Sequence, residues 1–372
     1  MSTEGRTCAV VMAGGIGERF WPISRPDLPK QLLPLADGRK TLLQATVDRL
    51  EGLIGPEDRY IITSESLQPL IVERTRGVYA TNVLAEPAKR NTLGAIIYAT
   101  ASILAASDAD SDGTVLAILP ADHHIGDPAG FRRTARQAIE AVRSTDALVT
   151  IGIRPHRPDT GYGYIQIGND EDRRQYGAAA DVLSFREKPD LETAESFLAS
   201  GNFLWNAGMF FWSVGAFREQ LAEAAPDAAE VMDEMLAAMR MRDDEAVRAQ
   251  FEELPNLSVD YALMERAERV LMVEAQFPWD ELGSWDAYAR ITEVDDDGNI
   301  TNGVTRIRDS HRCVVYNDLE QHGIAIALLG VEGMVVAAGP GGILVMPVER
   351  AQEVREIAQA GAVVQHSPEV AS

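Results

Sequence analysis

A glycine-rich turn directly after an apolar run near the N-terminus constrains this chain more than any other feature. Residues 8–12 read Cys-Ala-Val-Val-Met, an unbroken apolar run that predicts a buried strand. Three glycines then follow within four positions: Gly14, Gly15 and Gly17. Because glycine lets the backbone approach a ligand and turn its amides toward it, such a turn suits phosphate oxygens. Arg19 and Lys30 add positive charge downstream, so the segment indicates a site for a polyanion.

The spacing of this turn excludes two familiar phosphate loops. A P-loop ends in Gly-Lys-Ser or Gly-Lys-Thr, and the sequence contains no such ending. A dinucleotide-binding fingerprint requires a third glycine where this chain has Phe20. Pro22 and Pro26 then prevent a regular helix from following at once. The ligand of the turn therefore has to be inferred from the rest of the chain.

The composition is that of a globular protein with a strongly acidic balance. Its 372 residues suffice for one large domain and a smaller one, and no apolar run reaches the length of a membrane span. The first residues do not resemble a secretory signal, and Cys8 and Cys313 form no disulfide framework or zinc cluster, so we expect a cytoplasmic protein without membrane contact. The net charge of −23 argues against a nucleic-acid partner, but a few local cations still suffice to hold a nucleotide.

Strands and helices alternate through the first half of the chain. Ligands of a sheet built in this way bind beyond the carboxyl ends of its strands, and Glu86 and Asp122 both follow a predicted strand. The order of elements predicts a mostly parallel sheet covered by helices. The predicted strands are 59–63, 83–85, 114–119 and 148–153, and the predicted helices are 64–77, 91–106 and 131–143.

The second half of the chain has a different pattern. Short strands are expected between residues 161 and 212. The acidic turn at 295–299 marks a boundary, so we expect a large domain of residues 1–295 and a small β-rich domain of residues 296–372. The small domain is expected to close over the large one or to build the contact of a homodimer. The predicted helices of this half are 214–224, 227–240, 243–253, 260–268 and 349–360.

A series of short motifs follows in order from about residue 8 to about residue 355. They are AGG at 13–15, PKQ at 29–31, EP at 86–87, NT at 91–92, PADH at 120–123, GYGYI at 161–165, EKP at 187–189, WNAGMF at 205–210, SVDY at 258–261, and GSW at 283–285 after Asp280. In this set and order the chain resembles the sugar-nucleotide pyrophosphorylases, and segments 205–210 and 278–285 resemble their mannose/guanylyl branch. The resemblance implies an α/β, Rossmann-like nucleotidyltransferase fold with a mixed, mostly parallel central sheet, plus the small C-terminal β-rich domain.

The resemblance also implies a reaction, in which mannose 1-phosphate attacks the α-phosphate of GTP and gives GDP-mannose and pyrophosphate. The nucleophile is a phosphate oxygen whose second pKa is about 6, so it is already largely ionised near neutral pH. No general base is needed, and the reaction depends instead on alignment of two anions and neutralisation of their charge. Mg²⁺ or Mn²⁺ is the implied cofactor.

Five charged residues are implied to act on the phosphates. Arg19 would hold the departing β- and γ-phosphates, and Lys30 would contact the region of the α-phosphate. Lys188 would pair with the phosphate of the sugar. Asp122 and Asp280 would bind the metal, because two carboxylates, phosphate oxygens and water suit the octahedral oxygen shell of magnesium.

The remaining implied residues bind the two substrates. The nucleotide-binding set surrounds the glycine turn and the nucleoside side of the cleft: Ala13, Gly14, Gly15, Gly17, Arg19, Lys30, Glu86, Asn91, Thr92 and Asp122. The set for the sugar phosphate lies in later motifs: Gly163, Glu187, Lys188 and Asn206.

Each of these residues also has a purely structural interpretation. Taken alone, Asp122 is more simply read as the cap of a helix that begins near Asp127 or as the end of a strand. Asp280 reads as a solvated charge in a loop, and Lys30 and Lys188 as surface lysines beside prolines. The aromatic cluster 205–212 reads as core, whereas an Asn206 amide buried within it would need hydrogen-bond partners.

The sequence leaves three alternative functions to weigh, while a nicotinamide-dependent oxidoreductase is disfavoured by the glycine pattern and by the missing acidic residue for the ribose. One is a nucleotidyltransferase for a different NTP and sugar 1-phosphate, because base and sugar are distinguished by few hydrogen bonds. Another is a regulatory homologue that binds sugar nucleotides without turnover, which the presence of both cations and both carboxylates disfavours. The third is a metal-dependent phosphoesterase built on Asp122, His123 and His124, which would require further metal ligands. We favour a role for His123 in supporting Asp122 or bordering the nucleotide.

The C-terminal region departs most from the pattern of the family. Residues 338–342 read Ala-Gly-Pro-Gly-Gly, where related chains usually carry a more polar turn. The sequence stops short of the isomerase domain of some relatives, so isomerisation of mannose 6-phosphate is not expected.

Overall fold

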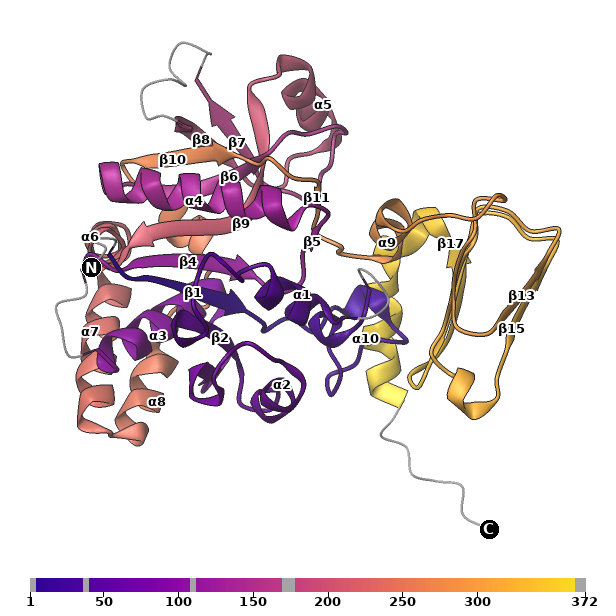
Figure 1. Cartoon of the computed structure of the whole chain (residues 1–372), viewed down its shortest axis with the longest axis horizontal. Coiled ribbons are helices and arrows are strands. Elements are labelled where there is room, and N and C mark those ends of the chain that lie inside the picture. Colours follow the sequence, from indigo (N-terminus) through magenta and orange to yellow (C-terminus); the bar gives the residue numbers. More distant parts are fainter. Residues whose placement is uncertain (1–4, 36–39, 108–111, 169–177, 365–372) are drawn as a thin grey trace. The chain divides into compact units, whose positions relative to one another are not determined.

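The computed structural model describes residues 5–35, 40–107, 112–168 and 178–364, and its largest element is a nine-stranded sheet (Figure 1). The strand order is β3-β2-β1-β4-β9-β6-β10-β8-β7. The strands are β1 (Thr7–Met12), β2 (Arg59–Ser64), β3 (Val83–Glu86), β4 (Val115–Pro120), β6 (Leu148–Ile153), β7 (Tyr164–Ile167), β8 (Ala179–Arg186), β9 (Phe203–Ser213) and β10 (Val270–Glu274).

The sheet is mixed, and its strands pair in parallel where the glycine turn begins. β1 pairs in parallel with β2 and with β4, so that Met12 lies opposite Ile62 on one side and Pro120 on the other. β9 is antiparallel to both β4 and β6, while β6 and β10 are again parallel. The predicted α/β fold with a mixed, mostly parallel central sheet is confirmed, and the carboxyl ends of β1, β2 and β4 meet at one edge.

Helices pack on this sheet, and α3 contacts α7 while α7 contacts α8. Across the described ranges, none of the helices combines the length and the apolarity that crossing a bilayer requires. The helices of the chain are α1 (Leu42–Asp48), α2 (Gln68–Arg74), α3 (Asn91–Ala105), α4 (Pro128–Thr145), α5 (Leu191–Ser200), α6 (Val214–Ala224), α7 (Pro226–Met241), α8 (Asp244–Glu253), α9 (Trp285–Ile291) and α10 (Val354–Val364).

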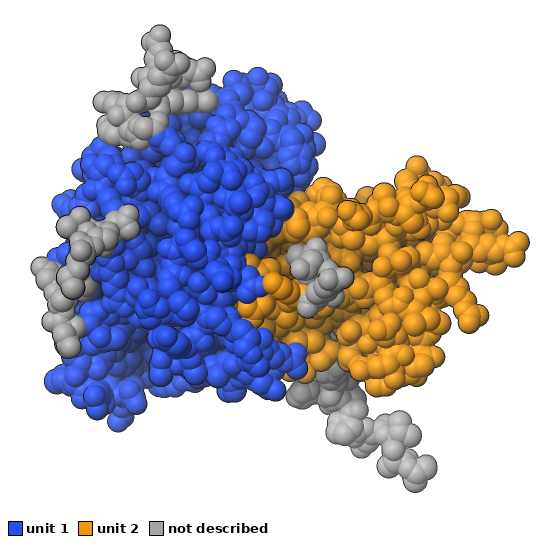
Figure 2. Space-filling view, viewed as in Figure 1, with its two compact units in different colours: residues 1–14, 46–121, 125–279 blue, residues 15–45, 122–124, 280–372 orange. Residues whose placement is uncertain are grey.

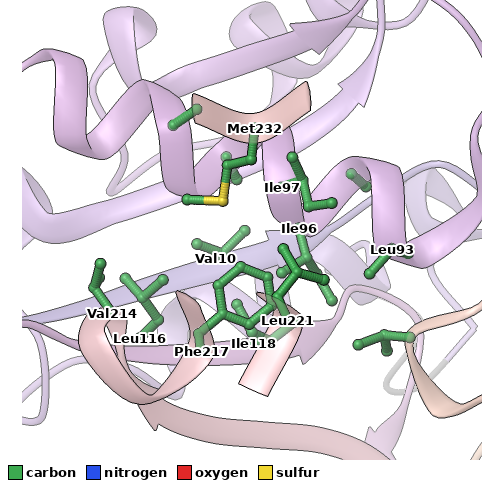
Figure 3. Packing of buried hydrophobic residues seen from close by; sticks show 14 of the residues in the cluster. Val10, Leu93, Ile96, Ile97, Leu116, Ile118, Val214, Phe217, Leu221 and Met232 are labelled. Atoms are coloured by element: carbon green, nitrogen blue, oxygen red, sulfur yellow. The ribbon is translucent and has the colours of Figure 1, made fainter. Parts of the chain in front are cut away.

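The main core lies between β1, β4 and the helices α3, α6 and α7. Figure 3 shows Val10, Ile96 and Phe217 converging in this cluster, and all three are fully buried. Every residue from Cys8 to Val11 is buried because both faces of the strand are covered, which is why the segment reads as a continuous apolar run rather than an alternating one. Trp212 is also fully buried, as its aromatic neighbourhood predicted.

Four predicted segments differ from the structure, and one of them, the helix expected over 349–360, is a 3₁₀ helix over Val348–Glu353 that is followed by α10. The helix expected over 64–77 is limited to α2, because β2 extends to Ser64. The expectation of short strands between residues 161 and 212 is wrong at α5, where the Asp190 side chain accepts a hydrogen bond from Thr193 N at 2.8 Å and caps the helix. Residues 169–177 of this range lie outside the described residues. The helix expected over 260–268 is a single π-helical turn, Asp260–Met264.

Contacts divide the chain into two compact units, shown in different colours in Figure 2. The first unit holds residues 1–14, 46–121 and 125–279, and the second holds residues 15–45, 122–124 and 280–372. The second unit therefore contains both the segment after the glycine turn and the C-terminal region. The predicted division into residues 1–295 and 296–372 concerns continuous domains, whereas these units combine segments that are distant in the sequence. The predicted division therefore stays a prediction.

The second unit contains a four-stranded sheet of order β12-β14-β16-β17 and a two-stranded sheet of β13 and β15. Its core joins Phe20 and Ile23, from the segment after the glycine turn, to Trp285 of α9 and to apolar residues of the small sheet. The β-rich character predicted for this region is confirmed. The strands are β12 (Ile300–Asn302), β13 (Thr305–Arg308), β14 (Val314–Asn317), β15 (Ile326–Leu329), β16 (Met334–Gly339) and β17 (Gly342–Pro347).

The glycine-rich hairpin between β16 and β17 packs on the segment that follows the glycine turn. A Cβ on Gly341 would lie 2.8 Å from Pro22 O, and one on Gly339 would lie 3.0 Å from both Pro22 O and Ile23 Cγ2. Gly342 has φ 138°, a backbone conformation that residues with a side chain rarely adopt. The unusual glycines of the C-terminal region are thus explained by close packing within the second unit.

Candidate active site

The glycine turn packs directly on Lys30. Gly17 adopts a left-handed conformation with φ 75° and precedes the short 3₁₀ turn Glu18–Phe20. Ser24 Oγ donates to Gly17 O at 2.6 Å, and Lys30 N donates to Ile16 O at 3.0 Å. A Cβ on Gly17 would lie 2.3 Å from Lys30 Cβ, so a larger residue does not fit without displacing Lys30.

Replacing Gly17 by alanine is therefore expected to lower the free energy of unfolding by about 2–4 kcal/mol, since left-handed strain and a steric clash add together. Gly15→Ala is the matched stability control, because nothing lies within 4 Å of a Cβ at Gly15. Its expected effect is below about 1 kcal/mol. Urea unfolding of both variants measures the difference, and equal midpoints would contradict the steric argument.

Lys30 is buried and ion-paired. Its Nζ lies 2.8 Å from Asp122 Oδ2 and donates to Glu281 O at 3.2 Å. The side chain of Lys30 is 5% exposed, whereas that of Asp122 is 35% exposed. The interpretation of Lys30 as a surface lysine is wrong. Because a buried ammonium requires a compensating charge, the pair places a fixed cation beside the glycine turn.

Asp122 is held as a carboxylate. Burial opposes its ionisation, but the positive charge of Lys30, together with that of His123, outweighs burial and holds the pKa of Asp122 below its usual value. The interpretation of Asp122 as a helix cap is wrong, because Asp127 caps α4 by accepting from Ala129 N at 2.9 Å. The expected support of Asp122 by His123 agrees with this electrostatic effect.

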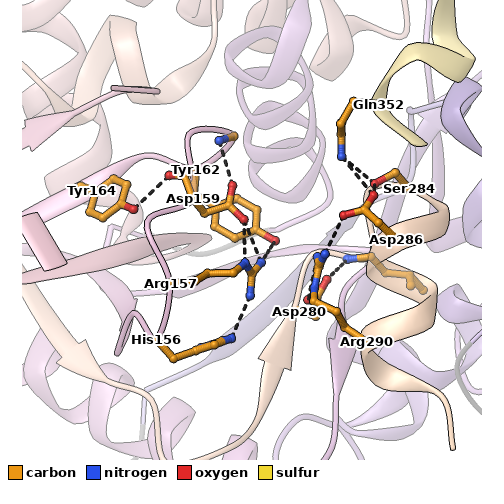
Figure 4. A network of polar contacts seen from close by, with 12 residues as sticks. His156, Arg157, Asp159, Tyr162, Tyr164, Asp280, Ser284, Asp286, Arg290 and Gln352 are labelled. Carbon is orange, nitrogen blue, oxygen red and sulfur yellow. Dashed lines mark hydrogen bonds and ion pairs between the residues drawn. The ribbon is translucent and has the colours of Figure 1, made fainter. Parts of the chain in front are cut away.

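Asp280 is buried and its two oxygens have different partners (Figure 4). Its Oδ1 accepts a hydrogen bond from Leu282 N at 2.8 Å, and its Oδ2 pairs with Arg290 at 3.2 Å. Arg290 also pairs with Asp286 at 2.6 Å, and Gln352 donates to Ser284 Oγ at 2.8 Å in the same network. The interpretation of Asp280 as a solvated loop charge is wrong, since its side chain is 7% exposed.

Arg19 has a donor that the described part of the chain leaves unsatisfied. Its Nε is buried and no described residue accepts a hydrogen bond from it. A buried guanidinium donor without a partner costs free energy, which a bound anion would recover. Lys30, Asp122, Asp280 and Arg19 all belong to the second unit.

The predicted nucleotide-binding residues of the first unit lie at the ends of β1 and β3 and at the start of α3. Ala13 N donates to Ile62 O at 2.8 Å, which fixes the entry to the glycine turn. A Cβ on Gly14 would lie 3.7 Å from Glu86 Oε1, so the carboxyl of Glu86 lies against this entry. Burial raises the pKa of Glu86 to about 7, with the charge of Lys89 opposing the shift.

Asn91 and Thr92 form the first residues of α3. Asn91 has φ 59°, and its Oδ1 accepts from Thr92 N at 2.9 Å. Thr92 Oγ1 accepts from Val259 N at 2.9 Å. This hydrogen bond ties the start of α3 to the turn that carries Asp260.

The predicted sugar-binding residues Gly163, Glu187 and Asn206 lie together. Asn206 N donates to Gly163 O at 2.8 Å. A Cβ on Gly163 would lie 2.6 Å from Glu187 Oε2, so a larger residue there would displace this carboxylate. The expectation that the Asn206 amide needs partners is confirmed, because its Nδ2 donates to Asp260 Oδ1 at 2.8 Å. Lys188 has φ 41°, and its exposed Nζ lies 3.5 Å from Glu187 Oε1.

Two residues that organise this region were given no role from the sequence: Asp260, which appeared only as part of the motif at 258–261, and Arg157, which was not singled out. Arg157 pairs with Asp159 at 2.8 Å and donates to Tyr162 OH at 3.2 Å (Figure 4). Its guanidinium also lies 4.9 Å from the ring centroid of Trp205. These contacts of Arg157 stabilise the loop that precedes Gly163. The signal in the sequence was an arginine two residues before an aspartate, next to the glycine-tyrosine motif.

The described residues do not form a metal centre on their own. Within these ranges no group of three or more His, Cys, Asp or Glu side chains is arranged to hold a metal ion. A phosphoesterase centre built on Asp122, His123 and His124 therefore lacks support there. A site of two carboxylates that completes its shell with water and phosphate oxygens remains compatible with Mg²⁺.

Comparison with known proteins gives two family matches. The model described as nucleotidyl transferase matches residues 8–298, and the one described as MannoseP isomerase/GMP-like beta-helix domain matches residues 307–360. The mannose-1-phosphate guanylyltransferase of Klebsiella pneumoniae is 36% identical over 357 residues, which cover 93% of this chain and 72% of the relative. That of Escherichia coli K12 is 34% identical over 363 residues, covering 96% of this chain and 73% of the relative.

A solved structure is similar over most of the chain. The crystal structure of a Thermus thermophilus protein named mannose-1-phosphate geranyltransferase has a TM-score of 0.83 and 34% sequence identity, and the match covers 95% of this chain and 99% of that one. The family matches, the relatives and the fold all agree. The chain therefore belongs to the nucleotidyl transferase family and, within it, to the mannose-1-phosphate guanylyltransferases.

Proposed function

We propose that this chain transfers the guanylyl group of GTP to mannose 1-phosphate, forming GDP-mannose and pyrophosphate. The observation that carries the proposal is the buried Lys30, paired with Asp122 at 2.8 Å and packed against Gly17. A buried cation beside an open backbone turn is suited to a polyphosphate, and relatives that cover most of this chain are named guanylyltransferases.

The chemistry requires charge neutralisation more than proton transfer. A phosphate oxygen of the sugar phosphate attacks the α-phosphorus, the new P–O bond forms, and the bond to the β-phosphate breaks with release of pyrophosphate. Lys30 stabilises charge near the α-phosphate, and the unsatisfied Nε of Arg19 donates to the departing pyrophosphate. Backbone amides at Gly14, Gly15 and Gly17 bind the triphosphate.

Asp122 and Asp280 would hold Mg²⁺ or Mn²⁺. The donor set fits such a cation because each carboxylate can accept several interactions, and hard cations of this kind prefer oxygen ligands. When bound, the ion supplies positive charge at the phosphates. Lys30 keeps Asp122 ionised for this role, and Arg290 with Leu282 N orients the carboxylate of Asp280.

Two further groups of residues select the substrates. Glu86, Asn91 and Thr92 line the nucleoside side, and Lys188 pairs with the sugar phosphate. Gly163, Glu187 and Asn206 bind the mannose hydroxyls, a role supported by the hydrogen bond from Asn206 N to Gly163 O at 2.8 Å. Carboxylate acceptors and an amide donor together match hydroxyl groups, which both donate and accept.

A grid of four NTPs and several sugar 1-phosphates, assayed for pyrophosphate release with Mg²⁺, tests the proposal. We expect strong release only with GTP and mannose 1-phosphate. Release with another pair would assign different substrates to the same chemistry. If no pair gives pyrophosphate release but the protein still binds GDP-mannose, the chain is a regulatory homologue instead.

We infer a homodimer in the cytoplasm as the working state. The support for the dimer is the edge strand β17, on which Ile343 and Val345 are 64% and 61% exposed. The support for a reducing compartment is that both cysteines, Cys8 and Cys313, are free and buried.

A further inference from the structure

Asp260 is a partly buried carboxylate for which the proposed reaction has no role so far. It begins the π-helical turn Asp260–Met264, and Val259, just before it, donates to Thr92 Oγ1 at 2.9 Å. Burial, reinforced by the charge of Glu187, raises the pKa of Asp260 to about 6, although the hydrogen bond from Asn206 opposes the shift. A carboxylate kept in such surroundings calls for a physical explanation.

The hydrogen bonds of the Asn206 carboxamide provide one. Its Oδ1 accepts from Gly208 N at 3.1 Å and from Thr150 Oγ1 at 3.2 Å. Its Nδ2 donates to Asp260 Oδ1 at 2.8 Å. Since a backbone N–H can only donate and a carboxylate can only accept, the carboxamide has one permitted orientation. Its second N–H hydrogen has no acceptor among the described residues and is available to a ligand.

The orientation of the Asn206 carboxamide matters because Gly163 and Glu187 lie beside it. The backbone of Asn206 donates to Gly163 O, and the Glu187 carboxylate lies over Gly163. A Cβ on Gly163 would lie 2.6 Å from Glu187 Oε2 and 3.7 Å from Asn206 Cβ, so both side chains lie beside the same glycine. An amide donor and a carboxylate acceptor at one place are suited to a hydroxylated ring. Without the acceptor at Asp260, the amide would lose the contact that aims its free hydrogen.

We propose that Asp260 is a positioning residue that orients the Asn206 carboxamide for the hydroxyls of the sugar. The inference rests on the proposed function, because it assumes that Asn206 contacts the sugar of GDP-mannose. Asp260 acts through Asn206, and its effect is confined to the sugar half of the ligand. The nucleotide half should bind independently of Asp260.

Calorimetric titration of the full chain with GDP-mannose and with GDP separates the contribution of the sugar half of the ligand from that of the nucleotide half. Asp260→Ala is expected to weaken GDP-mannose about 10-fold and GDP less than about 2-fold, as expected when a polar group of the ligand loses its partner. Asp260→Asn keeps an oxygen that can accept from Asn206, so it is expected to stay within about 3-fold of the wild type for both ligands. Asp260→Ser, whose hydroxyl is too short to reach Asn206, should reproduce the loss if the alanine variant does not fold.

Ser258→Ala provides the matched control for the turn itself. Ser258 Oγ accepts from Tyr261 N at 3.3 Å and so supports the same turn without contacting Asn206. Equal weakening of GDP-mannose by Ser258→Ala, or equal weakening of GDP and GDP-mannose by Asp260→Ala, would overturn the positioning role. Failure of the wild-type protein to bind GDP-mannose would instead overturn the proposed function, and this inference with it.

Discussion

Replacing Asp280 by asparagine is expected to lower turnover about 100- to 1000-fold while the chain stays folded. The substitution keeps an oxygen that can accept from Leu282 N, which Asp280 Oδ1 does at 2.8 Å. It removes the negative charge that we propose for the metal site. Arg290 retains its second partner, Asp286, so we expect a loss of only about 1–3 kcal/mol in the free energy of unfolding.

Asp286→Asn is the matched control for this variant. Asp286 and Asp280 both pair with Arg290, at 2.6 and 3.2 Å, but only Asp280 is placed in the catalytic machinery. The control therefore weakens the same arginine network and leaves the proposed metal carboxylate intact. We expect turnover within a few-fold of the wild type.

Pyrophosphate release as a function of Mg²⁺ concentration, together with urea unfolding, compares the two variants. Near-normal turnover of Asp280→Asn would remove Asp280 from the metal site. An equal loss in both variants would show that the arginine network, not the carboxylate, carries the effect.

Sequence patterns were sufficient for those parts of the fold that depend on neighbouring residues. β1 and β2 were predicted because continuous apolar runs identify strands covered on both faces. The prediction failed at α5, because the cap formed by Asp190 was outweighed by the strand pattern around it. It also failed after Asp260, where one turn with helical composition ends at Met264.

The sequence predicted which residues form the candidate site, but it did not predict which of them interact with one another. Arg19, Lys30, Asp122 and Asp280 were identified through motifs, which say nothing of partners distant in the chain. The ion pair of Lys30 with Asp122 and the hydrogen bond of Asn206 to Asp260 both join separate motifs. Only tertiary structure brings such groups together, so their burial and charge compensation could not be read in advance.

Lys30→Met is expected to show that one buried pair serves both stability and catalysis. The variant removes the cation proposed for the α-phosphate region, so turnover should fall about 100- to 1000-fold. It also leaves the Asp122 carboxylate without the Nζ that lies 2.8 Å away. Because Asp122 is partly exposed, we expect a loss of about 2 kcal/mol in the free energy of unfolding near neutral pH.

The dependence of this loss on pH follows from the direction of the shift. Lys30 helps to hold the pKa of Asp122 below its usual value, so the pair stabilises the folded chain above the pKa of the unfolded carboxyl. This stabilisation disappears as the pH falls through the lower pKa of the folded state. In the variant, burial without Lys30 raises the pKa of Asp122, so protonation relieves the penalty and the difference from the wild type narrows in acid.

The double variant Lys30→Met with Asp122→Asn separates the two roles. Neutralising the carboxylate removes the uncompensated charge, so we expect most of the lost stability to return at neutral pH, whereas turnover stays low. Urea unfolding at neutral and acidic pH and pyrophosphate release measure the two properties on the same proteins. If the second substitution restores no stability, the charge pair is not the source of the loss. If Lys30→Met retains normal turnover, the cation beside Gly17 does not act on the phosphates.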